Sequence, residues 1–403
     1  MKFFKHPIYP LLISLLIISS CADDDVSEIQ ERGDLVSSEL VFARGATQVQ
    51  TLLTIAGLDL PFEEFNYNVS FYKAEYLTIY KGENITVSSL VVLPDNFEGN
   101  LSTVSFQHGT IASNSEAPSQ LKSDDNLLSV YASLASIGTM VVVPDFIGFG
   151  SSVDIMHPYY AVDLTATSIF DNIYAARTLA EEKGFALSPK LYLAGYSQGG
   201  HATMSAHKYY EENEVDFFEL QASFPAAGGY DVVAFKDYFL SLETFHQPFF
   251  LAYVAQSYNE SFDLNEPLDK YFNEPYASRI PDLFDGSLSG GQVNQQLTDV
   301  ISDYLTEGFI INNDDETFDT FNQALENNSL VNWIPQIPIH MYHGDADITV
   351  PYQNSIISYD RLIENGASPN IVKFTTLPGG EHVSGFVPYL ELFLDELIEY
   401  ENK

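Results

Sequence analysis

The sequence predicts an α/β protein built on a mostly parallel sheet, with helices on both faces of the sheet and an inserted helical cap. Two observations lead to this fold class. Short apolar runs bounded by turn residues alternate with longer segments at helical spacing, and strands separated by helices favour parallel pairing through right-handed crossovers. Between 228 and 332 the alternation stops, and the chain becomes rich in aromatic residues. Because a segment this long is not a plain loop, we expect a cap of short helices there.

The individual elements follow from the residue patterns. The segments 67–80 and 84–93 are rich in β-branched and aromatic residues, and Gly82 lies between them, so we expect an antiparallel pair at a sheet edge. The further strands are expected at 103–107, 139–143, 191–194, 337–342 and 371–377. The helices are expected at 124–136, 163–183, 199–212, 352–365 and 386–400. The last of these helices has one apolar face at helical spacing.

The charge balance excludes two classes of partner. The 403 residues include 17 Lys and Arg against 56 Asp and Glu, which gives a formal net charge of −39. A surface this acidic repels phosphate backbones and anionic lipid headgroups. We therefore expect no nucleic-acid partner and no electrostatic docking on a membrane. Hydrophobic residues make up 45% of the chain, which is enough for a full core.

The N-terminal segment is typical of a targeting signal. Lys2 and Lys5 precede an almost wholly apolar run over 8–18, which is too short to span a bilayer stably. The one cysteine of the chain, Cys21, follows this run after two serines. The arrangement resembles a bacterial lipoprotein signal over 1–20, which implies that Cys21 carries lipid and that an acidic tether runs over 21–35. The protein would then be anchored in the bacterial cell envelope, at the outer membrane or cell surface; the alternative is a plain secretory signal and a secreted protein.

The first motif that carries chemistry is Gly195-Tyr196-Ser197-Gln198-Gly199, which comes directly after a predicted strand and opens a predicted helix. A nucleophile on a sharp turn between a strand and a helix is held in a strained backbone conformation, and flanking glycines let the two elements approach closely. The N-terminus of the helix offers backbone N–H groups to a developing oxyanion. Ser197 is therefore the candidate nucleophile, and the N–H of Gln198 is the first candidate oxyanion donor.

A second oxyanion donor is expected in the loop after the strand 103–107. This loop begins His108-Gly109-Thr110, and the glycine lets the chain bend so that the N–H of Thr110 points toward Ser197. His108 is interpreted as a residue that shapes this loop rather than as a catalytic base.

The acid and the base are sought downstream of the serine. A buried carboxylate is needed to orient the imidazole, and both Asp345 and Asp347 lie in the loop after the strand 337–342, with Asp347 favoured. His382 is the one histidine that follows either aspartate, so the order Ser, acid, His leaves it as the candidate base.

These motifs resemble the α/β-hydrolase superfamily and, within it, the secreted lipases of fungal type with their bacterial relatives. The matching stretches are 195–201, 144–150 with 157–159 beyond it, and 343–351. The resemblance covers roughly 85–225 and 335–400. It implies that Ser197 is the nucleophile, Asp347 the acid and His382 the base, that a cap follows the sixth strand, and that Asp145 and His157 shape a turn.

The expected organisation is therefore a hydrolase domain over 36–227 and 333–403, with a cap or lid over 228–332. The expected function is hydrolysis of a small-molecule or lipid carboxylic ester through an acyl-enzyme. A serine peptidase or aminopeptidase of the same superfamily is an open alternative, and a non-catalytic binding lipoprotein is another. No cofactor is expected. No metal is expected either, because no pair of histidines lies at ligand spacing with a carboxylate, and the acidic stretch 312–316 is interpreted as a solvated loop.

Overall fold

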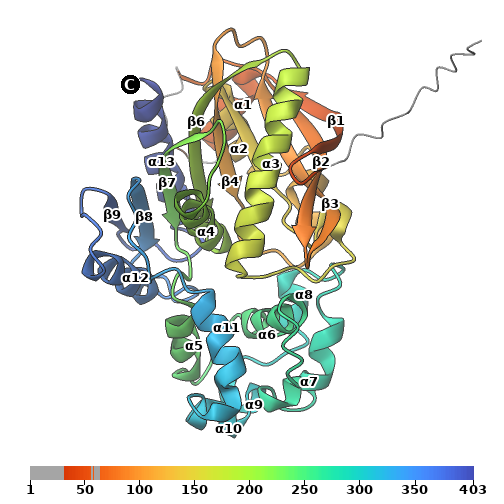
Figure 1. Ribbon diagram of the computed structural model, residues 1–403, viewed down its shortest axis with the longest axis vertical. Coiled ribbons are helices and arrows are strands. Elements are labelled where there is room, and N and C mark those ends of the chain that lie inside the picture. The colour runs from red at the N-terminus through yellow and green to blue at the C-terminus, as the bar shows by residue number, and fades with distance from the viewer. Residues whose placement is uncertain (1–30, 56–57, 59–63) are drawn as a thin grey trace, which may run out of the picture. The chain divides into compact units, whose positions relative to one another are not determined.

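A computed structural model describes residues 31–55, 58 and 64–403 and contains a sheet of nine strands in the order β1-β2-β3-β5-β4-β6-β7-β8-β9 (Figure 1). The strands are β1 (Leu35–Arg44), β2 (Val69–Tyr80), β3 (Glu83–Pro94), β4 (Asn100–Gln107), β5 (Thr139–Pro144), β6 (Ala186–Tyr196), β7 (Glu219–Ala226), β8 (Ile339–Gly344) and β9 (Val372–Leu377). Pairing is antiparallel from β1 to β5 through β2 and β3, and parallel from β5 to β9. The predicted mostly parallel sheet is confirmed.

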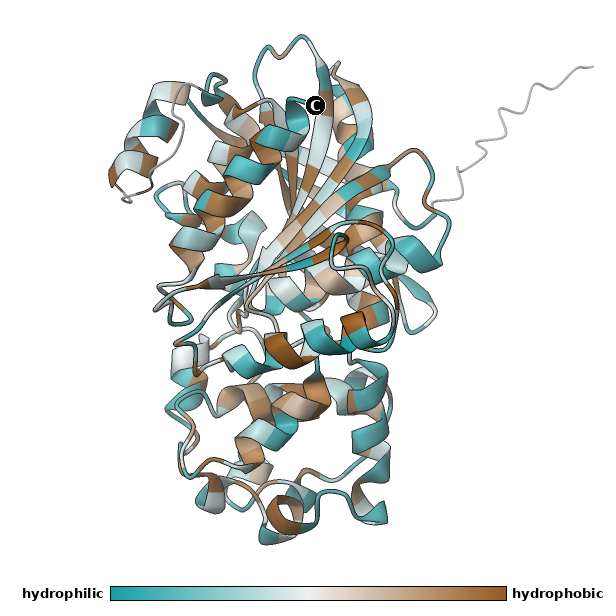
Figure 2. Ribbon diagram, turned by 90° about the vertical axis from the view of Figure 1, so that its left-hand side faces the viewer, coloured by the Kyte–Doolittle hydropathy of each residue, from teal (hydrophilic) through white to brown (hydrophobic). Residues whose placement is uncertain are grey.

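Helices cover both faces of this sheet. One face carries α1 (Ala46–Ile55), α2 (Leu127–Ser136) and α13 (Phe386–Glu401), and the other carries α3 (Val162–Glu182), α4 (Gln198–Glu212) and α12 (Tyr352–Glu364). Alternate residues of a strand point to opposite faces, so Val141 and Val143 of β5 pack under α2 while Met140 and Val142 pack under α3. Hydrophobic and hydrophilic residues are interleaved along the helices that flank the sheet (Figure 2).

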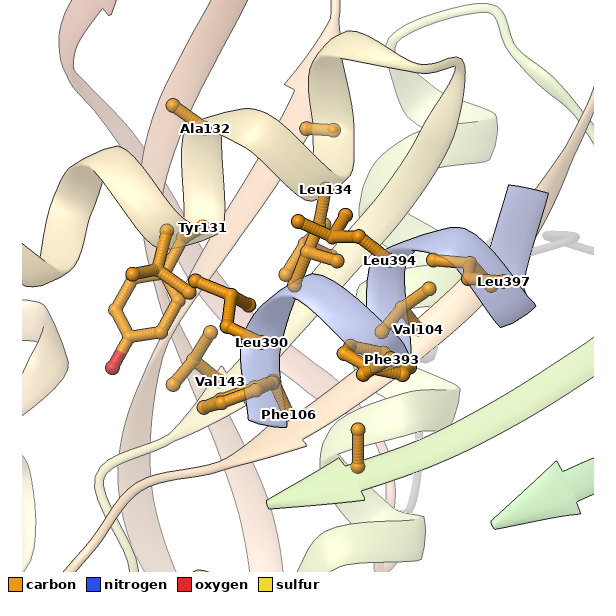
Figure 3. Close-up of a cluster of buried hydrophobic side chains, with 14 of the residues drawn as sticks. Val104, Phe106, Tyr131, Ala132, Leu134, Val143, Leu390, Phe393, Leu394 and Leu397 are labelled. Atoms are coloured by element: carbon orange, nitrogen blue, oxygen red, sulfur yellow. The ribbon is translucent and has the colours of Figure 1, made fainter. Parts of the chain in front are cut away.

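The largest core of the sheet lies under α2 and α13. Leu134 of α2 and Leu394 of α13 lie over Val104 of β4, and Phe106 contacts Phe393 with 6.4 Å between ring centroids (Figure 3). All five side chains are buried. This packing fixes the C-terminal helix to the central strands, and the loop that carries His382 leads directly into that helix.

Two parts of the sheet were not predicted. The first is β1 with the following α1: β1 pairs with β2, so the predicted edge pair lies one strand inside the edge. Most residues of β1 are exposed or half-buried, and its sequence lacks the continuous apolar run of the inner strands. The second is β7, whose Ala, Ser and Pro residues give little β signal although the strand is buried between β6 and β8.

Between β7 and β8 the chain forms the helices α5 (Val232–Leu240), α6 (Phe249–Ser261), α7 (Tyr276–Arg279), α8 (Gly290–Asn294), α9 (Ile301–Tyr304), α10 (Glu307–Asn312) and α11 (Asp319–Asn327). We call residues 228–332 the helical insertion. Figure 1 shows its helices gathered beyond the lower end of the sheet. Its aromatic residues form a hydrophobic cluster of their own, which Tyr159 and Tyr160 join from the sheet domain.

The predicted signal segment 1–20 and Cys21 lie outside the described residues, as does most of the predicted tether over 21–35. At the end of that tether, Arg32 Nε lies 2.8 Å from Asp171 Oδ1 of α3, and the N–H of Gly33 donates to the carbonyl of Leu77. Within 31–55, 58 and 64–403, no helix is both long enough and apolar enough to cross a membrane.

Candidate active site

Ser197 occupies the sharp turn between β6 and α4. Its φ of 61° and ψ of −122° lie in a region that residues with a side chain rarely adopt. Hydrogen bonds hold the turn in this conformation: the N–H of Ser197 donates to the carbonyl of Ala226 at 2.9 Å, and the N–H of Gly200 donates to the carbonyl of Ser197 at 2.9 Å. The strained turn projects the side chain of Ser197 out of the end of the sheet and into a cleft.

The glycines around Ser197 allow backbones to meet. A Cβ on Gly199 would overlap the carbonyl oxygen of Gln107 in β4, and a Cβ on Gly200 would overlap the carbonyl oxygen of Ala226 in β7. A Cβ on Gly195 would overlap the carbonyl of Gly199 across the turn itself. Helix α4 can therefore begin directly over the ends of two strands only because these positions lack side chains.

His382 lies in the loop between β9 and α13, and it contacts the serine. Its Nε2 is 2.9 Å from Ser197 Oγ, and its Nδ1 is 2.6 Å from Asp347 Oδ2. The hydroxyl of Tyr196 donates to the backbone carbonyl of His382 at 2.8 Å, which holds the loop against the turn. Parallel strands β6, β8 and β9 end at the same edge of the sheet, so three residues separated by 35 to 185 positions in the sequence meet there.

Asp347 is fully buried at the side chain and accepts several hydrogen bonds. Its Oδ1 accepts from the N–H groups of Thr349 and Val350 at 2.9 and 3.0 Å, and its Oδ2 lies near His382 and His343. Burial raises the pKa of Asp347, but the hydrogen bonds and charges of His343 and His382 outweigh burial and lower the pKa to about 2. The carboxylate is therefore ionised at neutral pH.

Asp345, the other candidate acid, does not contact His382. Its Oδ1 accepts a hydrogen bond from the N–H of Gly379 at 2.6 Å, and the N–H of Ala346 donates to the carbonyl of Gly380 at 3.1 Å. These bonds tie the loop of Asp347 to the loop of His382. Of the two aspartates that the sequence left as alternatives, Asp347 contacts His382 and Asp345 holds the loop.

The two candidate oxyanion residues come from different elements around the serine. Gln198 is the first residue of α4, and Thr110 lines the cleft together with Ser197. The side chain of Thr110 is held by Tyr159, with 2.9 Å between the two hydroxyl oxygens. The side chain of Gln198 points away into a buried network, where its Nε2 lies 2.7 Å from His157 Nε2.

His157 has a defined protonation state in that network. Its Nδ1 is 2.7 Å from the carbonyl of Ile147, so Nδ1 carries the proton and Nε2 accepts from the amide of Gln198. Burial lowers the pKa of His157 to about 3, which keeps the ring neutral. The ring joins the 144–150 turn to the start of α4.

His108 and Asp145 also contact backbone and side chains of loops rather than Ser197. His108 is buried, with Nδ1 2.7 Å from the carbonyl of Gly109 and Nε2 3.3 Å from that of Asp145, and burial lowers its pKa. Asp145 accepts from the hydroxyls of Ser88 and Ser119, each at 2.5 Å. The contacts of His108 join the 144–150 turn to the loop after β4, and those of Asp145 join it to β3 and to the segment of Ser119.

The serine opens into a cleft of about 730 Å³. That volume is within the range of small-molecule sites. Its lining mixes polar and apolar residues, namely Gly109, Thr110, Tyr196, Ser197, His246, Gln247, Phe249, Phe250, Ala346, Ile348, Thr349, Glu381, His382, Val383 and Phe386. The aromatic interior of the helical insertion, by contrast, leaves only about 50 Å³ and is a packed core. Within the described residues, no group of three or more His, Cys, Asp and Glu side chains is placed to hold a metal ion.

Sequence reasoning missed several residues of the cleft. His246 and Gln247 come from the helical insertion, and His246 Nε2 lies 3.0 Å from Thr349 Oγ1 beside the acid loop. No local pattern marks these two residues, because their position depends on how the insertion folds back. His343 and Tyr196 were within recognised motifs, but their contacts with Asp347 and His382 follow only from the fold.

Comparisons with known proteins agree with this architecture. The family model described as secretory lipase matches residues 114–216. A ligand-bound structure of the rice cell wall degrading esterase LipA from Xanthomonas oryzae is 25% identical, with 92% of this chain and 99% of that chain covered and a TM-score of 0.81. The chain has the α/β-hydrolase fold. The resemblance to the α/β-hydrolase superfamily and to its lipases is confirmed.

Other structures show how widely this hydrolase shares its fold. A putative hydrolase from Legionella pneumophila is 24% identical, covers 92% of this chain and 98% of its own, and has a TM-score of 0.81. Candida antarctica lipase A in its closed state is 16% identical over 89% of this chain and 79% of its own, with a TM-score of 0.64. No curated protein matches the chain. The lipase match and the esterase structures support a carboxylic-ester hydrolase, as expected from the sequence.

Proposed function

We propose that the protein cleaves carboxylic esters by nucleophilic catalysis, with Ser197 as nucleophile, His382 as general base and acid, and Asp347 as the acid that orients His382. One observation carries the proposal. His382 bridges the other two side chains, 2.9 Å from Ser197 Oγ and 2.6 Å from Asp347 Oδ2, at the wall of a cleft large enough for a small molecule.

The proton positions follow from these contacts. Asp347 is ionised and can only accept, so His382 Nδ1 donates to it, and the neutral ring then offers the lone pair of Nε2 to the hydroxyl of Ser197. Nε2 takes the hydroxyl proton as Oγ attacks the ester carbonyl. The negative charge of Asp347 stabilises the imidazolium that forms.

The second half of the reaction reverses these roles. The tetrahedral intermediate collapses to an acyl-enzyme as the imidazolium of His382 gives its proton to the departing alkoxide, which leaves as the alcohol. A water molecule then gives a proton to Nε2 and attacks the acyl carbon. Collapse of the second intermediate returns the proton to Ser197 and releases the carboxylic acid.

The oxyanion of each intermediate is assigned to the backbone N–H groups of Gln198 and Thr110. Gln198 opens helix α4, where backbone N–H groups and the positive end of the helix dipole face the cleft. Thr110 lines the same cleft beside Ser197. A donor of this kind contributes about 3 kcal/mol to the barrier of an acyl-transfer step.

The helical insertion is proposed to act as a cap that supplies the acyl wall of the cleft. Phe249 and Phe250 at the start of α6 line the cleft with their rings. Ile348 and Val383, which follow Asp347 and His382 in the sequence, also line the cleft, with 66% and 87% of their surfaces exposed. An acyl chain bound against these residues would bury apolar surface that the free enzyme leaves in water.

The lipase match also supports a secreted protein. The lipid anchor on Cys21 goes beyond that match and remains our proposal from the N-terminal sequence. In that arrangement the tether would hold an acidic enzyme at a membrane without electrostatic attraction to the lipid.

The decisive experiment is a comparison of Ser197→Ala with wild type on p-nitrophenyl esters from acetyl to palmitoyl. We expect the variant to lose at least about a thousandfold in kcat while its melting temperature stays unchanged. Ser205→Ala is a matched control, because Ser205 is a buried serine of the same helix that donates only to the carbonyl of His201. Undiminished ester cleavage by Ser197→Ala would refute the assignment.

An aminoacyl anilide belongs in the same panel. Efficient cleavage of the anilide by wild type, and its loss in Ser197→Ala, would identify a peptidase with the same three residues. Cleavage of esters without the anilide supports the esterase.

A further inference from the structure

A second imidazole lies behind the proposed catalytic acid. His343 is the residue before the last of β8, and its side chain is completely buried. Its Nε2 lies 3.1 Å from Asp347 Oδ2, the same oxygen that His382 contacts from the cleft side. His343 does not line the cleft, so it cannot touch a substrate there.

The surroundings of His343 define which nitrogen carries the proton. Its Nε2 faces two acceptors, Asp347 Oδ2 and the carbonyl of Val350 at 3.0 Å, so Nε2 must be protonated. Its Nδ1 lies 2.6 Å from Ser355 Oγ of α12, whose hydroxyl can donate to it. A neutral ring satisfies all of these contacts. Its Nε2–H is shared between Asp347 Oδ2 and the carbonyl of Val350, and the lone pair of its Nδ1 accepts from the hydroxyl of Ser355 in α12.

We propose that His343 is a positioning residue that donates its Nε2–H to Asp347 and so fixes Oδ2 where it receives His382. This inference rests on the proposed function, since it assigns His343 a task through Asp347. Oδ1 is held by two backbone N–H groups of the same loop, but Oδ2 has no backbone donor among the hydrogen bonds of the described residues. The direction of Oδ2 thus depends on His343, and Ser355 extends the support to helix α12.

Two amide substitutions separate this role from a general need for a polar side chain. The Nε2 of glutamine can reach the position of the histidine Nε2, whereas the amide of asparagine reaches only the position of Nδ1. We expect kcat for p-nitrophenyl butyrate to fall about 10- to 100-fold in His343→Asn, as for loss of a hydrogen bond to a charged group, and to stay within about threefold in His343→Gln. KM should change less than about twofold in both, because neither variant alters the cleft.

The second variant, Ser355→Ala, removes the donor that fixes the tautomer of His343 and leaves the imidazole in place. We expect it to lower kcat by about three- to tenfold with KM unchanged. His340→Gln is the matched control: His340 lies on the same strand, and its Nδ1 contacts the carboxylate of Glu396, away from the cleft. It should keep wild-type kcat.

Ser197→Ala, assayed in parallel, distinguishes a failure of the proposed function from a failure of the positioning role of His343. If Ser197→Ala is inactive while His343→Asn and Ser355→Ala both keep wild-type kcat, the positioning role is wrong and the proposed function stands. Equal loss in His343→Gln and His343→Asn, accompanied by equally lowered melting temperatures, also overturns the role, because it indicates a purely structural histidine. If His343→Asn does not fold, Ser355→Ala alone decides, and unchanged kcat in that variant refutes the proposal. Full activity of Ser197→Ala would instead refute the function.

Discussion

At the scale of single residues, the proposed chemistry depends on one carboxylate. Asp347 Oδ1 accepts from two backbone N–H groups, and Oδ2 lies between the imidazoles of His382 and His343. These interactions more than offset the cost of burial, so the pKa of Asp347 falls to about 2. A carboxylate held in this way stays ionised at neutral pH.

The lowered pKa of Asp347 predicts a pH-dependent contribution to stability. Because its folded pKa lies below the ordinary value of 3.8, the stabilisation is complete above about pH 4 and is lost as the pH falls through 2. Relative to Asp347→Asn, which does not titrate, the wild-type free energy of unfolding should fall by about 2 kcal/mol between about pH 5 and pH 2. Urea titrations of both proteins across this range measure the difference. If the free energies of unfolding of the two proteins change equally with pH, the carboxylate is not stabilised in its ionised form.

The sequence predicted most of the residues that meet at the proposed catalytic site, but it predicted little of what surrounds them. Ser197 and His382 were marked by a motif and by chain order, because each must occupy a particular position along the chain. Asp345 and Asp347 could not be separated by spacing, since both lie in the same loop and only the direction of each side chain decides. His246 had no signal at all, because its place in the cleft depends on the path of the helical insertion.

At the scale of elements, the turn between β6 and α4 positions Ser197, the proposed nucleophile. Gly199 and Gly200 allow α4 to begin against the carbonyl ends of β4 and β7, and hydrogen bonds to Ala226 of β7 and from Gly200 of α4 stabilise the strained conformation of Ser197. The turn is thus a joint between three strands and one helix. Its geometry is specified by the absence of side chains rather than by any contact that a side chain makes.

A methyl group at this joint should lower the free energy of unfolding. Gly199→Ala would press a Cβ onto the carbonyl oxygen of Gln107, so we expect a loss of about 3 kcal/mol in the free energy of unfolding, together with loss of ester cleavage. Gly308→Ala is the matched control in helix α10, where a Cβ meets nothing within 4 Å. That change should stabilise the protein by up to about 1 kcal/mol. Chemical denaturation measures both, and a neutral Gly199→Ala would contradict the close approach.

The strands β1 and β7 were missed because neither has the apolar pattern of the other strands. The buried strand β7 is composed of Glu, Leu, Gln, Ala, Ser, Phe and Pro residues, so neither alternation nor β-branched residues identify it; its place between β6 and β8 does. The edge strand β1 is half exposed, and its pattern differs from that of the inner strands. The other buried parallel strands and the long helices around the sheet were predicted because their apolar residues follow one period without interruption.

At the scale of the whole molecule, the described residues form several hydrophobic clusters within the sheet domain and one large cluster centred on the helical insertion. The cleft takes Ser197 and His382 from the sheet domain, and Phe249 and Phe250 from the helical insertion. Chemistry and acyl selection are therefore assigned to different parts of the chain, which can be altered separately.

This division predicts the effect of changing one ring. Phe249→Ala removes a ring from the apolar wall and so enlarges the cleft. The preferred p-nitrophenyl ester should shift to a longer acyl chain, with kcat on the new optimum within about tenfold of wild type. Phe309→Ala is the control, because Phe309 lies in the aromatic core of the insertion and does not line the cleft. It should lower stability by about 3 kcal/mol without moving the preference. If Phe249→Ala leaves the chain-length profile unchanged, the insertion does not form the acyl wall.

The proposed anchor predicts a change in the location of the protein. Cys21→Ser removes the only thiol that could carry lipid, so the variant should appear in the soluble fraction after expression in a bacterial host, while wild type sediments with membranes. Metabolic labelling with a fatty-acid analogue should mark wild type alone. Equal partitioning of the two proteins would support a plain secretory signal instead.

The convergence of Ser197, His382 and Asp347 is tested most directly by mass spectrometry after reaction with a fluorophosphonate. This reagent forms a stable bond to a serine oxygen that an adjacent base has activated. The account predicts one adduct per chain, mapped to the peptide that contains Ser197, with labelling slowed at least about a hundredfold in His382→Ala. A label on another residue, or labelling of Ser197 at the same rate without His382, would contradict it.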